Sequence, residues 1–542
     1  MDKKTLLAII LIFGVYYFSS EFIWNKQEQF VKHPAENVQE KSTYSKTEEK
    51  TEERFQKIQN EIEEEEEIEE NEIENNIILE NRNVKIVFTN RGGNIRQVYL
   101  KNIMKSQENK IPVELLLSEN GLFNIQLFTD SEEIDLGKHN LEYNLYGNEL
   151  EFYLEKDGKK IVQKKYKLKD DYNLSMDLIV KELGKIDSYN LGMDSGICFD
   201  EKDDKRFKNY IKTVFQKDNK VDKINLKKIV NETRELRGKF DWTVVKSKYF
   251  MIAAIPKDRV ELNKISAYAD ENSLKQNLTI EVSRTQFDHK FDFYLGPVNY
   301  DKLKEYNIGI ENAFDFGILP SITRPISKLV LGLLKFLYSL FPNFGISIII
   351  MSIMLKVVFY PLTHKGTRST KKMQEIQPKV KALQKKYKNN PQKSQQEVMA
   401  LYKEHGVSPL GGCLPLLIQM PVFFALYPVL QSSIALRHAK FILWIKDLSV
   451  PDPYSILPIV MGITMFLQQK LMAPKPTVDM DEKQLAQMKS QKFMMYGMPI
   501  FLVFIFRSLP AGLVLYWFSY NILSICEQLL IKKKEKNQIN EK

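Results

Sequence analysis

Nearly all long apolar runs of this 542-residue chain lie after residue 315, whereas the residues before it are polar or alternate between polar and apolar positions. A helix needs about 20 mostly apolar residues to cross a bilayer. By this test the sequence predicts membrane spans at about residues 344–363, 412–436, 454–471, 493–507 and 510–531. The last two form one stretch that would be about 57 Å long as a single helix, so it is expected to fold back near Pro510.

The amino-terminal 24 residues, MDKKTLLAIILIFGVYYFSSEFIW, predict a further membrane segment. Lys3 and Lys4 precede an apolar run that no convincing small-residue cleavage site follows, so an uncleaved anchor is favoured over a secretory signal peptide. Residues 25–78 include EIEEEEEIEENEIENN, whose low hydrophobicity and glutamate blocks predict an acidic, disordered tether.

Residues 79–312 alternate between apolar and polar positions over short runs that are separated by turn residues. Examples are VKIVFTNRGGNIRQVYL, ELEFYLEKDGKKIVQKKYKL and NLTIEVSRTQFDHKFDFYLG. Strand-length alternation broken at regular intervals is typical of antiparallel sheets, so this region is predicted to be a large antiparallel β-sandwich.

Residues 313–342 carry polar side chains at helical spacing beside the first predicted span. Arg324, Lys328, Lys335 and Ser339 follow one another at intervals of 4, 7 and 4, so they share one helical face. This pattern predicts an amphipathic helix lying in the membrane interface. A spanning helix is the alternative, and the charges along its whole length disfavour it.

Charge assigns the two sides of the membrane. The net charge is +9, but the basic residues gather beside apolar runs, which favours a membrane protein over a protein with a nucleic-acid substrate. Six crossings place both termini on one side, and the lysines at each end, including the basic tail 532–542, place that side in the cytoplasm. The β-domain is then expected on the opposite, external side of the membrane.

Residues 364–408 are then cytoplasmic and are predicted to form a helical hairpin. Met373, Ile376 and Val380 recur at spacings of 3 and 4, and Val398 and Leu401 follow in a second helix. The apolar seam favours a docking element for a ribosome, anionic lipid or another protein, whereas charge alone would allow a simple topology signal. The candidate docking residues are Lys371, Lys372, Lys379, Lys385 and Lys386.

Few features predict chemistry. Cys198, Cys413 and Cys526 are widely scattered, with no CxxC pair, so neither a disulfide framework nor a metal site is expected. No phosphate-binding loop is found, and no nucleophile, base and orienting residue can be assembled in the β-domain. The chain is therefore expected to use no cofactor or metal and not to be an enzyme.

Lys356 is the most informative residue, because it lies inside the apolar run GISIIIMSIMLKVVFYPLT. A charge at the membrane centre costs about 2.5–3.5 kcal/mol on insertion scales, so it suggests a function by default. Ser352 lies one helical turn before it, and Gln419, Gln468 and Gln469 add polar groups to other spans. Two interpretations stay open here: Lys356 snorkels or pairs with another group, or it faces a wet cavity.

Four segments resemble the YidC family of bacterial membrane-protein insertases and follow the order of that family. They are FPNFGISIIIMSIMLKVVFYPLT, VSPLGGCLPLLIQMPVFFALYPVL, LWIKDLSVPDPYSILPIVMGITMF and LPAGLVLYWFSYNILSICEQLLI. VKIVFTNRGGNIRQVYL, DWTVVKSKYFMIAAIP and FYLGPVNYDKL are similar to parts of the periplasmic domain of the Gram-negative branch.

This resemblance implies a multi-domain protein: a polytopic membrane domain of six helices, five of which form a groove, plus the exported β-sandwich. The family's groove has a positive residue, usually arginine, and Lys356 occupies its position. The resemblance further assigns Ser352, Gln419, Gln468, Gln469 and Trp517 to the groove, and Met420, Pro421, Phe423 and Tyr516 to contacts with a substrate helix.

The implied function is insertion and folding of inner-membrane proteins by a hydrated groove, by a monomer acting alone or with the Sec translocon. The implied partners are nascent membrane-protein clients, the ribosome and anionic lipids, without a direct nucleic-acid substrate. A small-solute transporter or channel is the alternative, but no internal repeat supports it. An exported carbohydrate-binding or carbohydrate-modifying protein with a membrane anchor is a third alternative, but it would leave five further spans and the basic hairpin unexplained.

Overall fold

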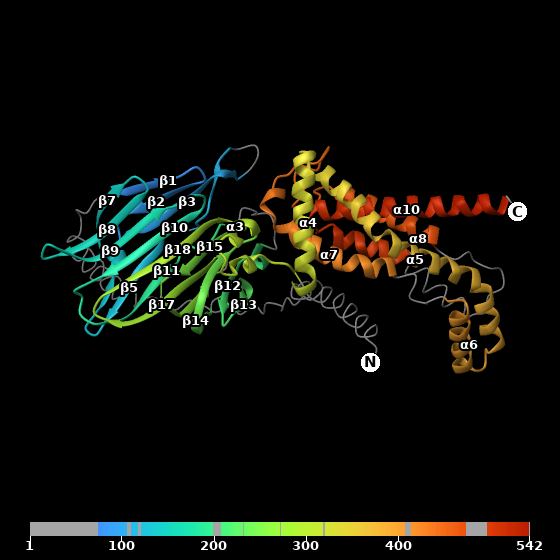
Figure 1. Cartoon of the computed structure of the whole chain (residues 1–542), viewed down its shortest axis with the longest axis horizontal. Helices are drawn as coiled ribbons and strands as arrows, with labels where there is room; N and C mark the ends of the chain where they lie inside the picture. Colours follow the sequence, from blue (N-terminus) through green and yellow to red (C-terminus); the bar gives the residue numbers. More distant parts are fainter. Residues whose placement is uncertain are drawn as a thin grey trace, which may run out of the picture. The chain divides into compact units, whose positions relative to one another are not determined.

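The computed structural model describes residues 74–540, apart from residues 106–109, 118–120, 199–206, 231, 259, 271–272, 318–319, 407–413 and 473–495. The predicted anchor at 1–24 and most of the predicted tether at 25–78 lie outside the described residues. Within Glu74–Lys542, which forms one compact unit, a β-rich part is followed along the chain by a helical part (Figure 1).

The β-rich part contains 18 strands among the described residues, and every ladder between them is antiparallel. Side chains in β10 alternate strictly between partly exposed and buried positions, as the sequence pattern predicts. The strands are β1 (Asn76–Glu80), β2 (Val84–Thr89), β3 (Asn94–Met104), β4 (Pro112–Glu114), β5 (Leu122–Thr129), β6 (Glu133–Asp135), β7 (Glu142–Tyr146), β8 (Glu149–Lys156), β9 (Lys159–Leu168), β10 (Asn173–Val180), β11 (Ile186–Met193), β12 (Lys212–Lys217), β13 (Lys220–Asn225), β14 (Thr233–Lys246), β15 (Phe250–Pro256), β16 (Leu262–Ala269), β17 (Leu274–Arg284) and β18 (Phe287–Pro297).

Strand β14 connects two runs of paired strands. Its first half pairs with β16, which continues through β17 and β11 to β5. Its second half pairs with β15, which continues through β18, β10, β9 and β8 to β7. The register shifts between Arg237 and Phe240, where Gly238 has a φ of 142° that side chains other than glycine rarely adopt. This bulge lets one strand serve both runs.

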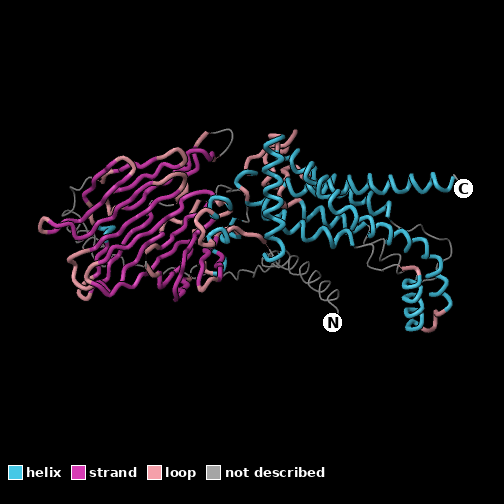
Figure 2. The backbone as a smooth tube through the Cα atoms, in the orientation of Figure 1, coloured by secondary structure: helices cyan, strands magenta, loops and turns pink. Residues whose placement is uncertain are grey.

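The antiparallel β-sandwich predicted for the exported region is confirmed (Figure 2). Its core is large and aromatic: Phe123 stacks on Phe293 with ring centroids 3.8 Å apart, and Phe88 lies 4.9 Å from Tyr166. Buried aromatic pairs of this kind add stability beyond the area that they bury.

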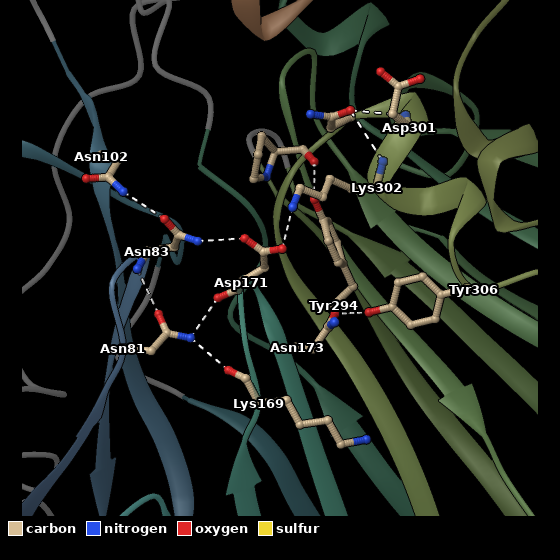
Figure 3. A network of polar contacts seen from close by, with 12 residues as sticks. Asn81, Asn83, Asn102, Lys169, Asp171, Asn173, Tyr294, Asp301, Lys302 and Tyr306 are labelled. Atoms are coloured by element: carbon tan, nitrogen blue, oxygen red, sulfur yellow. Dashed lines mark hydrogen bonds and ion pairs between the residues drawn. The ribbon is translucent and has the colours of Figure 1, made fainter.

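A polar network ties loops of the sandwich to the short helix α3 (Tyr300–Lys304) that follows the last strand (Figure 3). Asn83 donates from Nδ2 to Asp171 Oδ1 at 2.7 Å, and Asn102 donates to Asn83 at 2.7 Å. Lys302 of α3 pairs with the same Asp171 carboxylate. One carboxylate therefore fixes the start of the segment that leads from the sandwich toward the helices.

The helical part confirms the prediction of a helical carboxy-terminal domain. Two of its segments are long and apolar enough to cross a membrane by length and composition, Phe344–Pro361 and Ala511–Lys533, among the residues that the structure describes. The predicted count of six spans therefore stays a prediction. The helices are α4 (Pro320–Leu340), α5 (Phe344–Lys386), α6 (Pro391–Glu404), α7 (Leu414–Ser432), α8 (Ile456–Met472), the shorter apolar helix Tyr496–Phe506 and α10 (Ala511–Asn540).

Helix α5 joins two elements that the sequence analysis separates, the span at 344–363 and the first arm of the hairpin. It has 43 residues, about 65 Å at 1.5 Å per residue, and it continues through Pro361 and Pro378. Asn343 caps its start, because Oδ1 accepts from the backbone N–H of Gly345 at 2.9 Å and of Ile346 at 3.2 Å. The first arm of the hairpin is therefore a direct continuation of the helix that forms the predicted span.

Helix α4 packs on α7 through one side and leaves large apolar side chains on another. Val330 and Leu334 are buried in the helical core, and Ser327 donates to the Ala425 carbonyl at 2.8 Å. Leu329 and Phe336 are exposed, at 66% and 58%. Such exposed side chains suit contact with lipid, but they do not test the predicted interfacial position.

Candidate functional site

The site around Lys356 is built where α5 and α10 pack side by side. Gly512 lies close to the other elements: a Cβ added there would lie 3.1 Å from Leu448 O and 3.2 Å from Ile348 Cδ1. Small residues let membrane helices approach in this way. Further along both helices, Lys356 contacts Ser524. Since both contacts advance in the same chain direction, the two helices run parallel.

Lys356 is only 9% exposed, and its ammonium group has three partners on α10. Nζ donates to Ser524 Oγ at 2.9 Å and lies 2.9 Å from Glu527 Oε2. It also lies 4.5 Å from the centroid of the Tyr520 ring, within the range of a cation–π contact. Of the two sequence interpretations, pairing therefore describes Lys356 in this structure.

Sequence reasoning missed all three partners, although a helical signal for them exists. Tyr520, Ser524 and Glu527 follow one another at spacings of 4 and 3, so they share one face of α10. Glu527 is the one charged residue within the mostly apolar run ILSICEQLLI, which makes it as unexpected as Lys356. A search for an acidic residue in a second span would have found it.

The ion pair is incompletely satisfied. The side chains of Lys356 and Glu527 are each 11% exposed, so both charges are largely withdrawn from solvent. Glu527 Oε1 is buried and accepts no hydrogen bond from the residues that the structure describes. A buried pair recovers its desolvation cost only when its remaining lone pairs are also hydrogen-bonded. Among the described residues, the carboxylate is thus held at one oxygen only.

A second group of predicted residues meets between α7 and α10. Gln419 donates from Nε2 to the hydroxyl of Tyr516, and both side chains are buried. The Trp517 ring packs edge-on against Phe423, with centroids 5.4 Å apart. Tyr516 lies one turn before Tyr520, so this group continues the face of α10 that contacts Lys356.

The remaining predicted groove residues are less closely joined to Lys356. Ser352 is fully buried and donates to the Ile348 carbonyl of its own helix at 2.7 Å. Gln468 and Gln469 lie partly buried on α8, and Met420 and Pro421 lie partly buried on α7. Among the described residues, the contacts of the Lys356 ammonium group include none with these four side chains.

The hairpin residues lie apart from this site. Ile376 and Val380 of α5 are buried and pack with Val398, Leu401 and Tyr402 of α6. Lys372, Lys379, Lys385 and Lys386 are exposed, Lys379 Nζ lies 3.3 Å from His405 Nε2, and Lys371 lies on the same helix. The hairpin thus has a small apolar core and a basic surface.

Comparison with known proteins identifies two family models along the chain. Residues 76–329 match the model described as the YidC periplasmic domain, and residues 336–538 match the one described as the 60Kd inner membrane protein. The first covers the β-sandwich, and the second covers the helices that carry Lys356 and Glu527.

Several relatives are similar in sequence and are named membrane protein insertase YidC. The protein from Chlorobium limicola is 32% identical over 84% of this chain and 82% of its own length, and that from Endomicrobium trichonymphae is 31% identical over 85% of each. The protein from Syntrophus aciditrophicus is 44% identical, but the match spans 52% of its length. The chain thus spans about half the length of some relatives and most of the length of others.

A solved structure is also similar, a crystal structure of an active YidC insertase with its first transmembrane domain resolved. It is 17% identical, covers 84% of this chain and 92% of its own, and gives a TM-score of 0.35. The family assignment rests on the sequence comparisons.

Proposed function

The chain belongs to the YidC family of membrane protein insertases, and on this premise we propose that it inserts and helps to fold proteins of the inner membrane. The observation that carries the proposal is the buried ammonium group of Lys356, held between the two helices that are long and apolar enough to cross a membrane. A charge in such a place is costly, so it is expected to serve a function.

The mechanism is physical and needs no covalent step. A hydrated groove beside Lys356 lowers the cost of moving a short polar tail of a client partway across the bilayer, and the ammonium group attracts acidic side chains on that tail. The apolar segment of the client then moves into lipid, which contributes roughly 25 cal/mol per Å² of buried apolar area.

The other predicted residues have supporting roles in this proposal. Ser352, Gln419, Gln468, Gln469 and Trp517 provide the polar side of the groove, and Met420, Pro421, Phe423 and Tyr516 guide the apolar segment. The hydrogen bond from Gln419 to Tyr516 and the contact of Phe423 with Trp517 support a continuous path along α10.

The topology that we propose has six spans, both termini in the cytoplasm and the sandwich in the periplasm. The basic hairpin of α5 and α6 then faces the cytoplasm, where it docks ribosomes or anionic lipid, and the Sec translocon assists with some clients. The exposed lysines over a packed apolar core support this role.

Depletion and complementation test the proposal. Cells depleted of this protein and lacking any paralogue receive a small client with an acidic exported tail, and protease protection of the tail measures insertion. We expect insertion to fail on depletion and to return with the wild-type gene. Normal insertion in the depleted cells would exclude the proposed function.

A further inference from the structure

The partner of Lys356 suggests how the site selects its clients. Glu527 carries the charge that a client's acidic side chain would also carry, and its carboxylate already lies 2.9 Å from the ammonium group. A client acid that approaches the site therefore meets a pair that is close to neutral. Because opposite charges so near each other nearly cancel at longer range, the attraction expected of an isolated lysine is much reduced.

We propose that Glu527 is a resident counter-ion, which an acidic group on the client's tail must displace from Lys356 before the tail can be held in the site. This inference rests on the proposed insertase function and adds to it a residue that determines specificity. Glu527 keeps Lys356 paired in the empty protein and sets how strongly the site prefers acidic over neutral tails.

The geometry favours exchange over a permanent link. Only Oε2 of Glu527 is held, while Oε1 is buried and accepts no hydrogen bond from any described residue. The other partners of Lys356 are the hydroxyl of Ser524 and the ring of Tyr520, neither of which is an acid. A client carboxylate can therefore take the place of Glu527 while both other contacts of the ammonium group stay in place.

The position of Glu527 also allows it to move away. It lies within the last two turns of the apolar segment Ala511–Lys533, and its neighbour Cys526 is exposed. Leu529 and Leu530 on the following turn are exposed too, at 50% and 63%. These exposed neighbours show that other described helices leave this end of α10 uncovered, so in our proposal a change of side-chain rotamer takes the Glu527 carboxylate away from Lys356 toward the end of the segment, without any change in the backbone.

The test compares two clients that differ only by one Asp→Asn change in the exported tail, inserted by the full-length protein in depleted cells. Protease protection at a fixed short time gives the ratio of acidic to neutral insertion. We expect Glu527→Gln to raise this ratio about threefold, because the competing charge is gone and the shape of the side chain is kept. Glu375→Gln makes the same chemical change on the exposed part of α5 and should leave the ratio at the wild-type value.

Two further variants test whether the change in the ratio depends on the charges of Lys356 and Glu527. Lys356→Ala combined with Glu527→Gln should not raise the ratio of acidic to neutral insertion above the wild-type value, since the rise requires the ammonium group. If Glu527→Gln does not accumulate in the membrane, Glu527→Asp withdraws the carboxylate by one methylene group and should give a smaller rise.

An unchanged ratio in Glu527→Gln or in Glu527→Asp would overturn the inference, and so would a gain that persists without Lys356. Equal losses for both clients would show that the pair only joins α5 to α10. Failure of the wild-type protein to insert either client would instead refute the proposed function, so the two failures are distinguishable.

Discussion

The β-sandwich and the helical part each bury a lysine, and they treat it differently. In the sandwich, Lys164 is fully buried, and Nζ donates to Gly92 O at 2.7 Å, Phe123 O at 2.8 Å and Asn94 Oδ1 at 3.0 Å. In the helical part, Lys356 has a carboxylate and a hydroxyl on a second helix. The first lysine meets uncharged oxygens, and the second meets an acid.

In our proposal, this difference in partners distinguishes Lys164, a structural lysine, from Lys356, a lysine that acts on clients. Burial lowers the pKa of Lys164 well below its ordinary value, because uncharged oxygens compensate a buried ammonium group poorly. Two of its acceptors are backbone carbonyls, which cannot leave the site. The charged partner of Lys356 is the side chain of Glu527, which in our proposal rotates away and is replaced by a client carboxylate. An exchangeable partner is what a site for transient clients needs.

The largest effect is expected from removing the structural lysine. Lys164→Met leaves three buried oxygens without their donor, so the free energy of unfolding of the segment 74–317 should fall by about 3 kcal/mol. Urea unfolding of that segment measures it. Lys167→Met, on the exposed side of the same strand, should change it by about 0.5 kcal/mol or less. Equal effects of the two changes would contradict the structural role.

Lys356 should show energetic coupling to Glu527. Lys356→Met leaves Glu527 buried without a counter-ion, whereas Lys356→Met with Glu527→Gln removes both charges. We expect a coupling free energy of about 2 kcal/mol from a double-mutant cycle, measured by SDS unfolding of the full chain in mixed micelles. Additive effects would show that the two side chains do not form the pair that the structure has.

A half-buried histidine of the sandwich, His289, makes the stability of that part depend on pH. His289 Nδ1 lies 3.0 Å from the Tyr189 hydroxyl, and burial, together with Arg284, lowers its pKa from 6.5 to about 4. Between these two values the unfolded chain binds more protons than the folded one, so stability is lost as the pH falls from about 6.5 toward 4.

The expected loss is about 1–2 kcal/mol after allowance for the partial exposure of His289. Urea unfolding of the segment 74–317 at pH 6.5 and pH 4.5 measures it, with His289→Gln as the control. If the variant loses as much stability as the wild type over this range, other groups cause the pH dependence.

The smallest effect is expected at Ser352, the predicted groove residue next to Lys356 on α5. Its hydroxyl donates to a carbonyl of its own helix. Ser352→Ala should therefore change the free energy of unfolding in mixed micelles by about 0.5 kcal/mol or less. The ratio of acidic to neutral client insertion should also stay at the wild-type value. A selective loss of acidic clients would show that Ser352 contacts the tail directly.

Periodicity predicted the sandwich and most helices, but it could not supply the partner of Lys356. Which face of α10 meets α5 depends on close packing at Gly512, and spacing within one helix contains no such information. The length of α5 was also missed. The change from apolar to basic sequence near Pro361 suggested that the helix ends there, whereas it continues to Lys386.

The buried state of Lys164 was predictable in part. The alternation in β9 places it on the same face as Val162 and Tyr166, which are buried. The acceptors could not be inferred in the same way, since Gly92 and Phe123 come from other strands and turns. Sequence patterns thus indicate which side chains are buried, whereas the contacts that satisfy them depend on the fold.

The central claim is that the charge of Lys356 attracts acidic client tails, and one ratio tests it most directly. Insertion of the acidic and the neutral client is measured by protease protection in depleted cells that carry Lys356→Ala or Lys356→Arg. We predict that Lys356→Ala weakens insertion of the acidic client more than that of the neutral one, and that Lys356→Arg restores the wild-type ratio. Equal losses for both clients in Lys356→Ala would contradict the claim.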